Sequence, residues 1–350
     1  MNESLTEKTR VLHTWLKESD TIAIVSQNGP DGDAAGCVTA FRNFVTGVIG
    51  NKAGILLPSP APDYLSFITN GENILFPDSG DPDDFLECAD LLVCLDFNTM
   101  SRTDTLEKRL TELNVRKVLI DHHPGPDETQ FDLVFSSTEV SSACEMLYNI
   151  LMAMPEIAGD ASKLPAKTAI ALMTGMTTDT NNFANSVFPG TLAMASELLA
   201  AGVDRDEIIE HLYHEYRPNR IALCSHMLCN ELHTVPGGGA YMIVRRKTWE
   251  QFGAIEGETE GLVNTPLSIK DIRLSLLLRE DDGFFRVSVR SKEGVSANTM
   301  ARECFHGGGH ERAAGGRVFF PGDIESPDEI ETYVIETTAR FLQNIGPAKN

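Results

Sequence analysis

Three short runs of aliphatic and β-branched residues, each ending at a polar side chain, constrain the fold of this chain most strongly. They are 21–27 (TIAIVSQ), 91–96 (LLVCLD) and 117–121 (KVLID). Runs of this length and composition are typical of buried parallel strands. The intervening segments CVTAFRNFVTGV and TDTLEKRLTEL repeat apolar residues with helical spacing. This alternation predicts an α/β fold with a doubly wound, mainly parallel sheet, in which ligands bind beyond the carboxyl ends of the strands.

The pattern changes along the second half of the chain. Helical spacing predominates after about residue 140 and predicts two further helices, over 190–201 and 204–233, before the glycine-rich break VPGGGA. Beyond the break the period becomes two, in AYMIVRR, IRLSLLL and FFRVSVR, and an Asp-Gly turn of the hairpin type joins the last pair. The sequence therefore predicts an α/β domain over 1–202, a helical linker over 203–238 and a smaller α+β domain over 239–346, since 350 residues exceed what one core usually serves.

Charge and composition exclude several classes of function. The formal net charge is −22, and proteins that grip long nucleic acids normally present a basic face, so we expect no long nucleic acid as a partner. The stretch 273–317 is the least acidic part, and an anion-binding surface is expected there. No apolar run is long enough to span a bilayer, so no membrane partner is expected. The seven cysteines form no CxxC pair and are interpreted as reduced thiols of a cytoplasmic protein.

Two aspartates follow the first predicted strand, in the segment 30–36 (PDGDAAG). Asp31 and Asp33 alternate across a glycine, and carboxylates at this spacing can point at one centre, as hard cations such as Mg²⁺ and Mn²⁺ require. An ordinary turn that leads into a helix would have the same residue types. The glycine spacing does not match a dinucleotide-binding loop.

More acids and two histidines stand at the ends of the other predicted strands. Asp96 ends the second run, and Asp121 ends the third, immediately before His122 and His123. Asp179 ends an apolar helical segment. Each alone would be explained as a helix cap or a hydrogen-bonded histidine, but acids gathered at one sheet edge repel each other unless a cation compensates them. Carboxylates with one or two imidazoles suit two Mn²⁺ or Mg²⁺ ions better than zinc.

A glycine-rich segment, 307–316 (GGGHERAAGG), lies in the least acidic stretch. Three successive glycines let backbone N–H groups approach an anion closely, and His310 can donate to a phosphate. A flexible loop is the alternative interpretation. Arg290 and Ser291, at the end of a predicted strand shortly before it, favour a phosphate or nucleotide site.

Five motifs in order resemble those of the DHH family of phosphoesterases. The family is named for the tripeptide found here at 121–123. PDGDA at 30–34, LDF at 95–97 and TDT at 178–180 resemble its other metal motifs, and GGGHERAAGG resembles the signature of the DHH-associated C-terminal domain. The resemblance covers most of the chain and is much more specific for family than for substrate.

The resemblance implies roles for individual residues. Two Mn²⁺ ions, with Mg²⁺ or Co²⁺ as alternatives, would be held by Asp31, Asp33, Asp96, His122 and Asp179. His123 would contact the scissile phosphate, acting with Asp96 and His122 in catalysis. Substrate would be bound from the C-terminal domain by Arg290, Ser291, Gly307, Gly308, Gly309 and His310.

The expected activity is hydrolysis of small nucleotides: very short oligoribonucleotides, phosphoadenosine phosphate, or linear or cyclic dinucleotides. An inorganic pyrophosphatase or exopolyphosphatase is the alternative enzyme. A catalytically weak nucleotide-binding protein is the other alternative, because Gln27 stands where family members usually have a histidine ligand. Gln27 is thus an uncertain ligand, and three expectations stay open: a lowered affinity at one metal position, readier use of Mg²⁺, or reduced activity. The sequence is compatible with a monomer or a homodimer.

Overall fold

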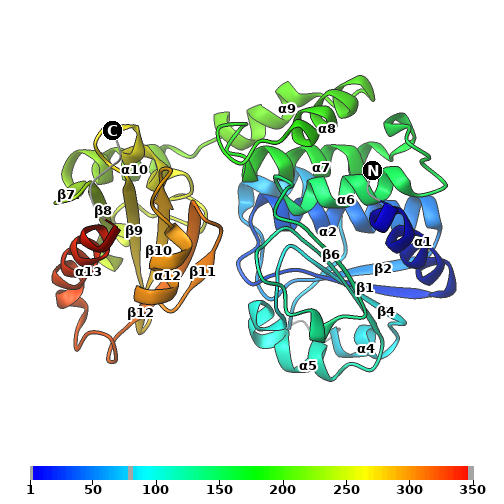
Figure 1. Ribbon diagram of the computed structural model, residues 1–350, viewed down its shortest axis with the longest axis horizontal. Coiled ribbons are helices and arrows are strands. Elements are labelled where there is room, and N and C mark those ends of the chain that lie inside the picture. The colour runs from blue at the N-terminus through cyan, green and yellow to red at the C-terminus, as the bar shows by residue number, and fades with distance from the viewer. Residues whose placement is uncertain (1–2, 78–81, 346–350) are drawn as a thin grey trace. The chain divides into compact units, whose positions relative to one another are not determined.

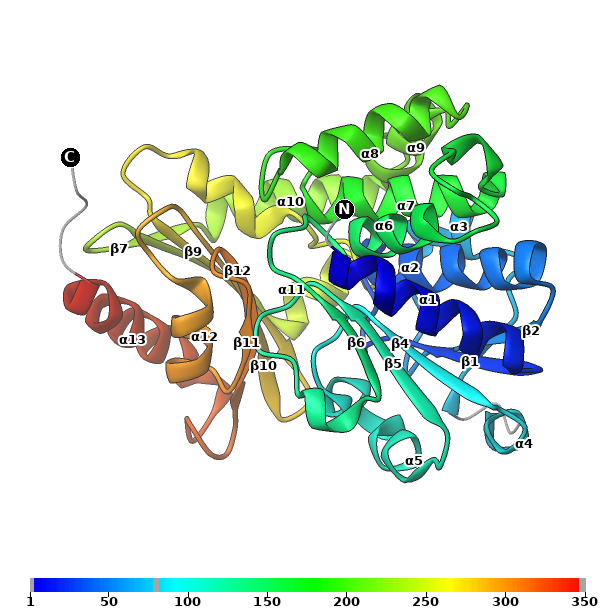
Figure 2. The ribbon, with the colours of Figure 1, turned by 45° about the vertical axis from the view of Figure 1, so that its right-hand side comes forward.

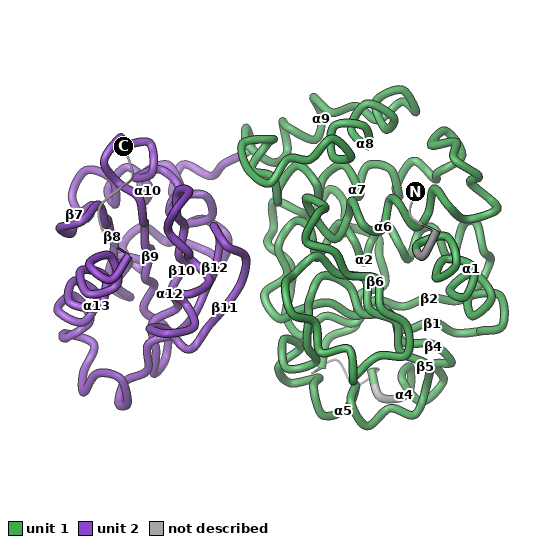
Figure 3. Tube along the Cα trace, viewed as in Figure 1, with its two compact units in different colours: residues 1–215 green, residues 216–350 purple. Residues whose placement is uncertain are grey.

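The structure, a computed structural model, describes residues 3–77 and 82–345 (Figure 1). The chain divides into two compact units, residues 1–215 and 216–350 (Figure 3). The stretch predicted as a linker, 203–238, spans this division. Among the described residues, no helix is both long and apolar enough to cross a membrane.

Unit 1 is built on a parallel sheet of six strands with the order β3-β2-β1-β4-β5-β6. Its strands are β1 (Thr21–Val25), β2 (Lys52–Leu56), β3 (Ile74–Leu75), β4 (Leu91–Leu95), β5 (Arg116–Asp121) and β6 (Leu133–Ser136). The three predicted strands are confirmed as β1, β4 and β5, which are neighbours in the sheet. The order is that of a doubly wound fold whose topological switch point lies between β1 and β4.

Helices cover both faces of this sheet (Figures 1 and 2). One face carries α1 (Glu3–Glu18), α2 (Gly32–Phe44), α6 (Ala143–Ala153) and α7 (Ala166–Asp179), and the other carries α4 (Pro82–Glu87) and α5 (Glu107–Glu112). Successive side chains of β1 alternate between the two cores: Ile22 and Ile24 pack with the first helix group, Ala23 and Val25 with the second. A short helix, α3 (Ser66–Thr69), follows β2.

The helical end of unit 1 differs from the prediction. The expected helix over 190–201 is present as α8 (Pro189–Ala200). The single helix expected over 204–233 is wrong: the segment forms α9 (Arg205–Ile209), a π-helical turn (Glu210–His214) and, in unit 2, α10 (Pro218–Asn230). Pro218 causes the break, because a proline disfavours helical geometry in the preceding residue, and Arg217 is extended with ψ of 145°.

Unit 2 holds a mixed sheet with the order β11-β12-β10-β9-β8-β7. Its strands are β7 (His233–Val235), β8 (Gly239–Val244), β9 (Leu274–Asp281), β10 (Phe284–Ser291), β11 (Gly308–Gly309) and β12 (Ala313–Phe319). Among the described strands of unit 2, only β8 and β9 pair in parallel, and β9 and β10 form the predicted hairpin. The two faces of the sheet pack on α12 (Ala297–Cys304) with α13 (Ile330–Ile345), and on α10 with α11 (Arg246–Gln251).

Candidate metal centre

The carboxyl ends of β1, β4 and β5 carry the predicted site. Asp96 follows β4 directly, and His122 follows β5. Asp33 lies in the first turn of α2, and Asp179 is the last residue of α7. The two helices pack closely, since a Cβ on Gly175 of α7 would lie 2.9 Å from Asp33 Oδ1. A doubly wound sheet places these side chains at its ligand-binding edge.

Three carboxylates converge on one imidazole nitrogen. His122 Nε2 lies 3.8 Å from Asp33 Oδ2, 3.6 Å from Asp96 Oδ1 and 3.6 Å from Asp179 Oδ2. These distances exceed those of hydrogen bonds. They suit neighbouring ligand atoms around a cation that is held at about 2.0–2.2 Å from each. We call Asp33, Asp96, His122 and Asp179 the strand-end cluster.

The carboxylate of Asp33 is fixed by the start of α6. Its Oδ2 accepts a hydrogen bond from the backbone N–H of Ala143 at 2.6 Å, and its Oδ1 accepts one from Cys144 at 3.0 Å. Ser142 caps the same helix by accepting from Glu145 N. Burial, followed by the charge of Asp179, nevertheless raises the pKa of Asp33 to about 6. The site therefore holds this group in place without compensating its charge fully.

Asp96 is the least satisfied member of the strand-end cluster. Its backbone adopts a φ of 63°, which is uncommon for a non-glycine residue. Its side chain is 2 % exposed, and among the described residues Oδ1 finds no hydrogen-bond partner. Burial, together with the charge of Asp33, raises the pKa of Asp96 well above its ordinary value. A buried acceptor of this kind, facing other acids, fits a divalent cation.

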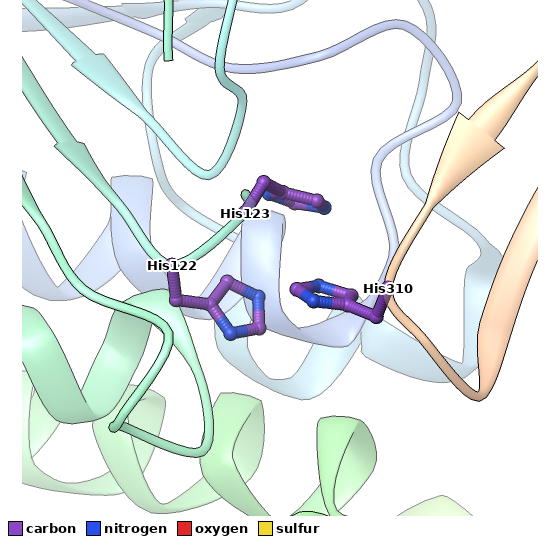
Figure 4. A group of neighbouring side chains, drawn as sticks. All are labelled: His122, His123 and His310. Atoms are coloured by element: carbon purple, nitrogen blue, oxygen red, sulfur yellow. The ribbon is translucent and has the colours of Figure 1, made fainter. Parts of the chain in front are cut away.

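The two histidines after β5 have different surroundings, and their rings stand edge to face with centroids 4.9 Å apart (Figure 4). Burial lowers the pKa of His122, which favours the neutral imidazole that a metal needs. His123 Nδ1 lies 2.7 Å from Asp121 Oδ1. Burial lowers the pKa of His123, but the hydrogen bond and the charge of Asp121 together raise it by more, so the pKa lies above its ordinary value. His123 is thus oriented by Asp121 and suited to interact with an anion.

Asp31 occupies a different kind of position from the strand-end cluster. It is exposed and caps α2, with its side chain accepting hydrogen bonds from Asp33 N and Ala34 N at 3.1 Å each. Among the described residues, the groups close enough to share one ion do not include Asp31. Its role as a ligand stays a prediction.

The side chain of Gln27 lies between Asp96 and Arg102 at this edge of the sheet. It is 6 % exposed, its Nε2 donates to Asp96 Oδ2 at 3.3 Å, and its Oε1 accepts from Arg102 Nη2 at 2.5 Å. Arg102 belongs to the 3₁₀ segment Met100–Leu106 and was not predicted as a site residue. No local pattern in the sequence singles it out, because the contact depends on how this segment packs beside β1.

The predicted substrate-binding residues gather at one end of the sheet in unit 2. Arg290 pairs with Ala313 across β10 and β12, and His310 N donates to Ala313 O at 2.7 Å. Ser291 is buried, and its hydroxyl donates to Val295 O at 2.6 Å. The substrate-binding roles of these residues stay predictions.

The glycines of this region pack mainly against their own unit. A Cβ on Gly307 would overlap the backbone of Gly315, and one on Gly309 would lie 2.6 Å from Ala313 O. A Cβ on Gly308 would be 3.6 Å from Asn298 Oδ1, an ordinary contact. Close backbone packing therefore accounts for Gly307 and Gly309, whatever they also contribute to binding.

Comparison with known families assigns both units. Residues 21–176 match the DHH family, N-terminal domain, and residues 238–326 match the DHHA1 domain. The chain thus carries a DHH family N-terminal domain followed by a DHHA1 domain. It is thus a hydrolase of phosphate esters, as expected from its motifs, and its acidic and histidine side chains include groups able to hold a metal ion.

Several relatives of this DHH protein match over nearly its full length. The bifunctional oligoribonuclease and PAP phosphatase NrnA of Bacillus subtilis is 29% identical, with 89% of this chain and 93% of that protein covered. The NrnA of Thermus thermophilus is 28% identical, with 88% of each covered. An exopolyphosphatase-related protein from Bacteroides fragilis superimposes with a TM-score of 0.86 and is 29% identical over 97% of both chains. The RecJ of Thermus thermophilus, 16% identical with a TM-score of 0.57, shares the fold.

Proposed function

We propose that this chain hydrolyses small nucleotide phosphate esters with the help of two divalent metal ions, preferably Mn²⁺. The substrates are very short oligoribonucleotides, phosphoadenosine phosphate, or linear or cyclic dinucleotides. The observation that carries the proposal is the convergence of Asp33, Asp96 and Asp179 within 3.8 Å of His122 Nε2. The names of the NrnA relatives support the substrate class.

The residues of the strand-end cluster would hold the ions, which when bound supply an activated water and positive charge at the phosphoryl oxygens. Asp33 is presented by the backbone N–H groups of α6, so its carboxylate needs no rearrangement. His123, oriented by Asp121, donates to the phosphate and stabilises the charge that develops in the transition state. In unit 2, Arg290 and His310 bind the rest of the substrate.

A length ladder tests the substrate class. Rates on phosphoadenosine phosphate, cyclic dinucleotides and oligoribonucleotides of increasing length would be measured with Mn²⁺ and after chelation. We expect metal-dependent rates that fall steeply with length, because a chain of net charge −22 repels long polyanions. Rates that are equal or rise with length would contradict the proposed substrate class.

One observation favours a second candidate. The relative from Bacteroides fragilis is described as exopolyphosphatase-related. Pyrophosphate and polyphosphate therefore belong in the same panel, and faster release of phosphate from them than from any nucleotide would favour an inorganic pyrophosphatase or exopolyphosphatase.

A further inference from the structure

The amide of Gln27 has only one orientation that satisfies its two partners. A guanidinium can only donate hydrogen bonds, whereas a carboxylate oxygen accepts them. Arg102 Nη2 therefore holds the amide oxygen, and the NH₂ group is turned toward Asp96 Oδ2. We refer to this chain of contacts, Arg102 to Gln27 to Asp96, as the guanidinium relay.

Arg102 is exposed, but the segment that carries it is held to the residues after β1 by hydrogen bonds. Asn28 N donates to Arg102 O at 2.9 Å, and Asn28 Nδ2 donates to Asp104 Oδ2 at 2.8 Å. On the other side, Gly29 N donates to Ser59 Oγ at 2.8 Å. Asp104 itself is held at φ 49° and ψ −112°, outside the helical region. One backbone and one side-chain hydrogen bond from Asn28 thus place Arg102 beside Gln27.

The guanidinium relay gives the two carboxylate oxygens of Asp96 different surroundings. Oδ1 faces His122 Nε2 at 3.6 Å and finds no hydrogen-bond partner among the described residues. Oδ2 receives the Gln27 amide. An ion on the His122 side meets an open carboxylate oxygen. An ion on the Gln27 side would have to displace an N–H donor and approach the guanidinium of Arg102.

We propose that Arg102, acting through Gln27, makes the two metal positions unequal, so that the resting protein binds one ion tightly and a second ion weakly. This inference rests on the metal dependence in the proposed function. Arg102 is a positioning residue here: it fixes which atom of Gln27 faces Asp96. Removing the guanidinium would let the amide turn its oxygen, a metal ligand, toward the second position.

Titration calorimetry of Mn²⁺ into the metal-free full chain, without substrate, tests the relay. The wild type should bind one ion at least about tenfold more tightly than the second, the range in which residues behind metal ligands act. Arg102→Met should tighten the second ion by about tenfold. Arg102→Lys, which keeps a charged donor, and Lys108→Ala, which removes an exposed charge elsewhere, should resemble the wild type.

A double variant separates the relay from the long-range charge of Arg102. In a Gln27→His background, Arg102→Met should tighten the second ion much less than it does in the wild type, because the imidazole leaves no amide to turn. An equal gain in both backgrounds would overturn action through Gln27. Two equally tight ions in the wild type would overturn the inequality and leave the proposed function intact. Absence of any Mn²⁺ binding would overturn the proposed function with it.

Discussion

The strand-end cluster of unit 1 and the glycine-rich segment of unit 2 both carry predicted site residues, and they differ in how far their polar groups are satisfied. In unit 1, Asp96 Oδ1 and Asp121 Oδ2 are buried and find no hydrogen-bond partner among the described residues. In unit 2, the hydroxyl of Ser291 and the N–H of Gly309 are used within the unit itself. These buried carboxylate oxygens of the first region have no donor among the described residues, whereas these two groups of the second are satisfied by its own atoms.

The metal-binding role of the strand-end cluster follows from its buried charges, whereas the substrate-binding role of the glycine-rich segment follows from the family resemblance. Buried carboxylates with raised pKa values destabilise a fold when they are charged, unless a positive group compensates them. The strand-end cluster therefore indicates a bound cation even without the family resemblance. In unit 2, the Ser291 hydroxyl and the Gly309 N–H find partners without a substrate. The function of the glycine-rich segment depends on what it adds when a substrate is bound, and the two regions should respond differently to substitution.

The largest expected effect is the loss of turnover on substituting a metal ligand. Asp96→Asn and His122→Ala should each lower the rate by far more than a hundredfold, since even residues behind metal ligands contribute roughly 10- to 100-fold. Rates with saturating Mn²⁺ would be measured beside the thermal transition. Retained activity with an unchanged transition would remove the substituted residue from the site.

His123→Ala should have the next largest effect. We expect turnover to fall by about a hundredfold, the typical contribution of a group that stabilises developing charge. Mn²⁺ binding should be unchanged, because His123 is assigned to the phosphate and is held by Asp121. Calorimetry beside kinetics distinguishes the two roles, and a variant that also lost metal would be a ligand instead.

A smaller and substrate-dependent effect is expected in unit 2. His310→Ala should slow hydrolysis of a dinucleotide or phosphoadenosine phosphate by about tenfold, as expected for one hydrogen bond to a charged group. Hydrolysis of an artificial aryl phosphodiester, which has no second nucleotide to be bound, should change much less. Glu311→Ala, next to it and exposed, serves as the control. Equal losses on both substrates would contradict the assignment of His310 to substrate binding.

The smallest expected effect is on stability. Because the pKa of Asp33 is raised to about 6 by folding, the metal-free folded state binds a proton more tightly than the unfolded state does. The contribution of Asp33 to the free energy of unfolding should therefore be largest below about pH 4 and fall as pH rises through about 6, by on the order of 1–3 kcal/mol. Asp33→Asn should lack this part of the pH dependence. Parallel profiles for the two proteins would show that Asp33 titrates normally.

The sequence predicted the sheet and the position of the site because both depend on local signals. The apolar runs that end at Asp96 and Asp121 were recognisable as strands, and neighbouring parallel strands bring their ends to one edge. The strand β2 was missed, since Lys52–Leu56 is short and lies directly after a helix. The break before Pro218 could have been predicted from the proline itself, but the apolar periodicity on both sides favoured one continuous helix.

The missing parts of the site depend on tertiary packing. The backbone N–H groups of Ala143 and Cys144 hold Asp33 from a helix more than a hundred positions along the chain. Such contacts leave no pattern in the sequence, because almost every residue type has a backbone N–H group. Arg102 likewise acts through Gln27, which is 75 positions away. Sequence motifs identified the groups that would touch the metal, whereas the groups that orient them emerged from the fold.

Thermal unfolding of the full chain with and without Mn²⁺ tests most directly whether the strand-end cluster holds a metal. A ligand that binds only the folded state at 100 times its Kd stabilises it by about 2.7 kcal/mol, so Mn²⁺ should raise the unfolding midpoint of the wild type at pH 7. The same addition should leave Asp96→Asn almost unchanged. A wild-type midpoint that is the same in Mn²⁺ and in chelator, or an equal rise in both proteins, would contradict the account.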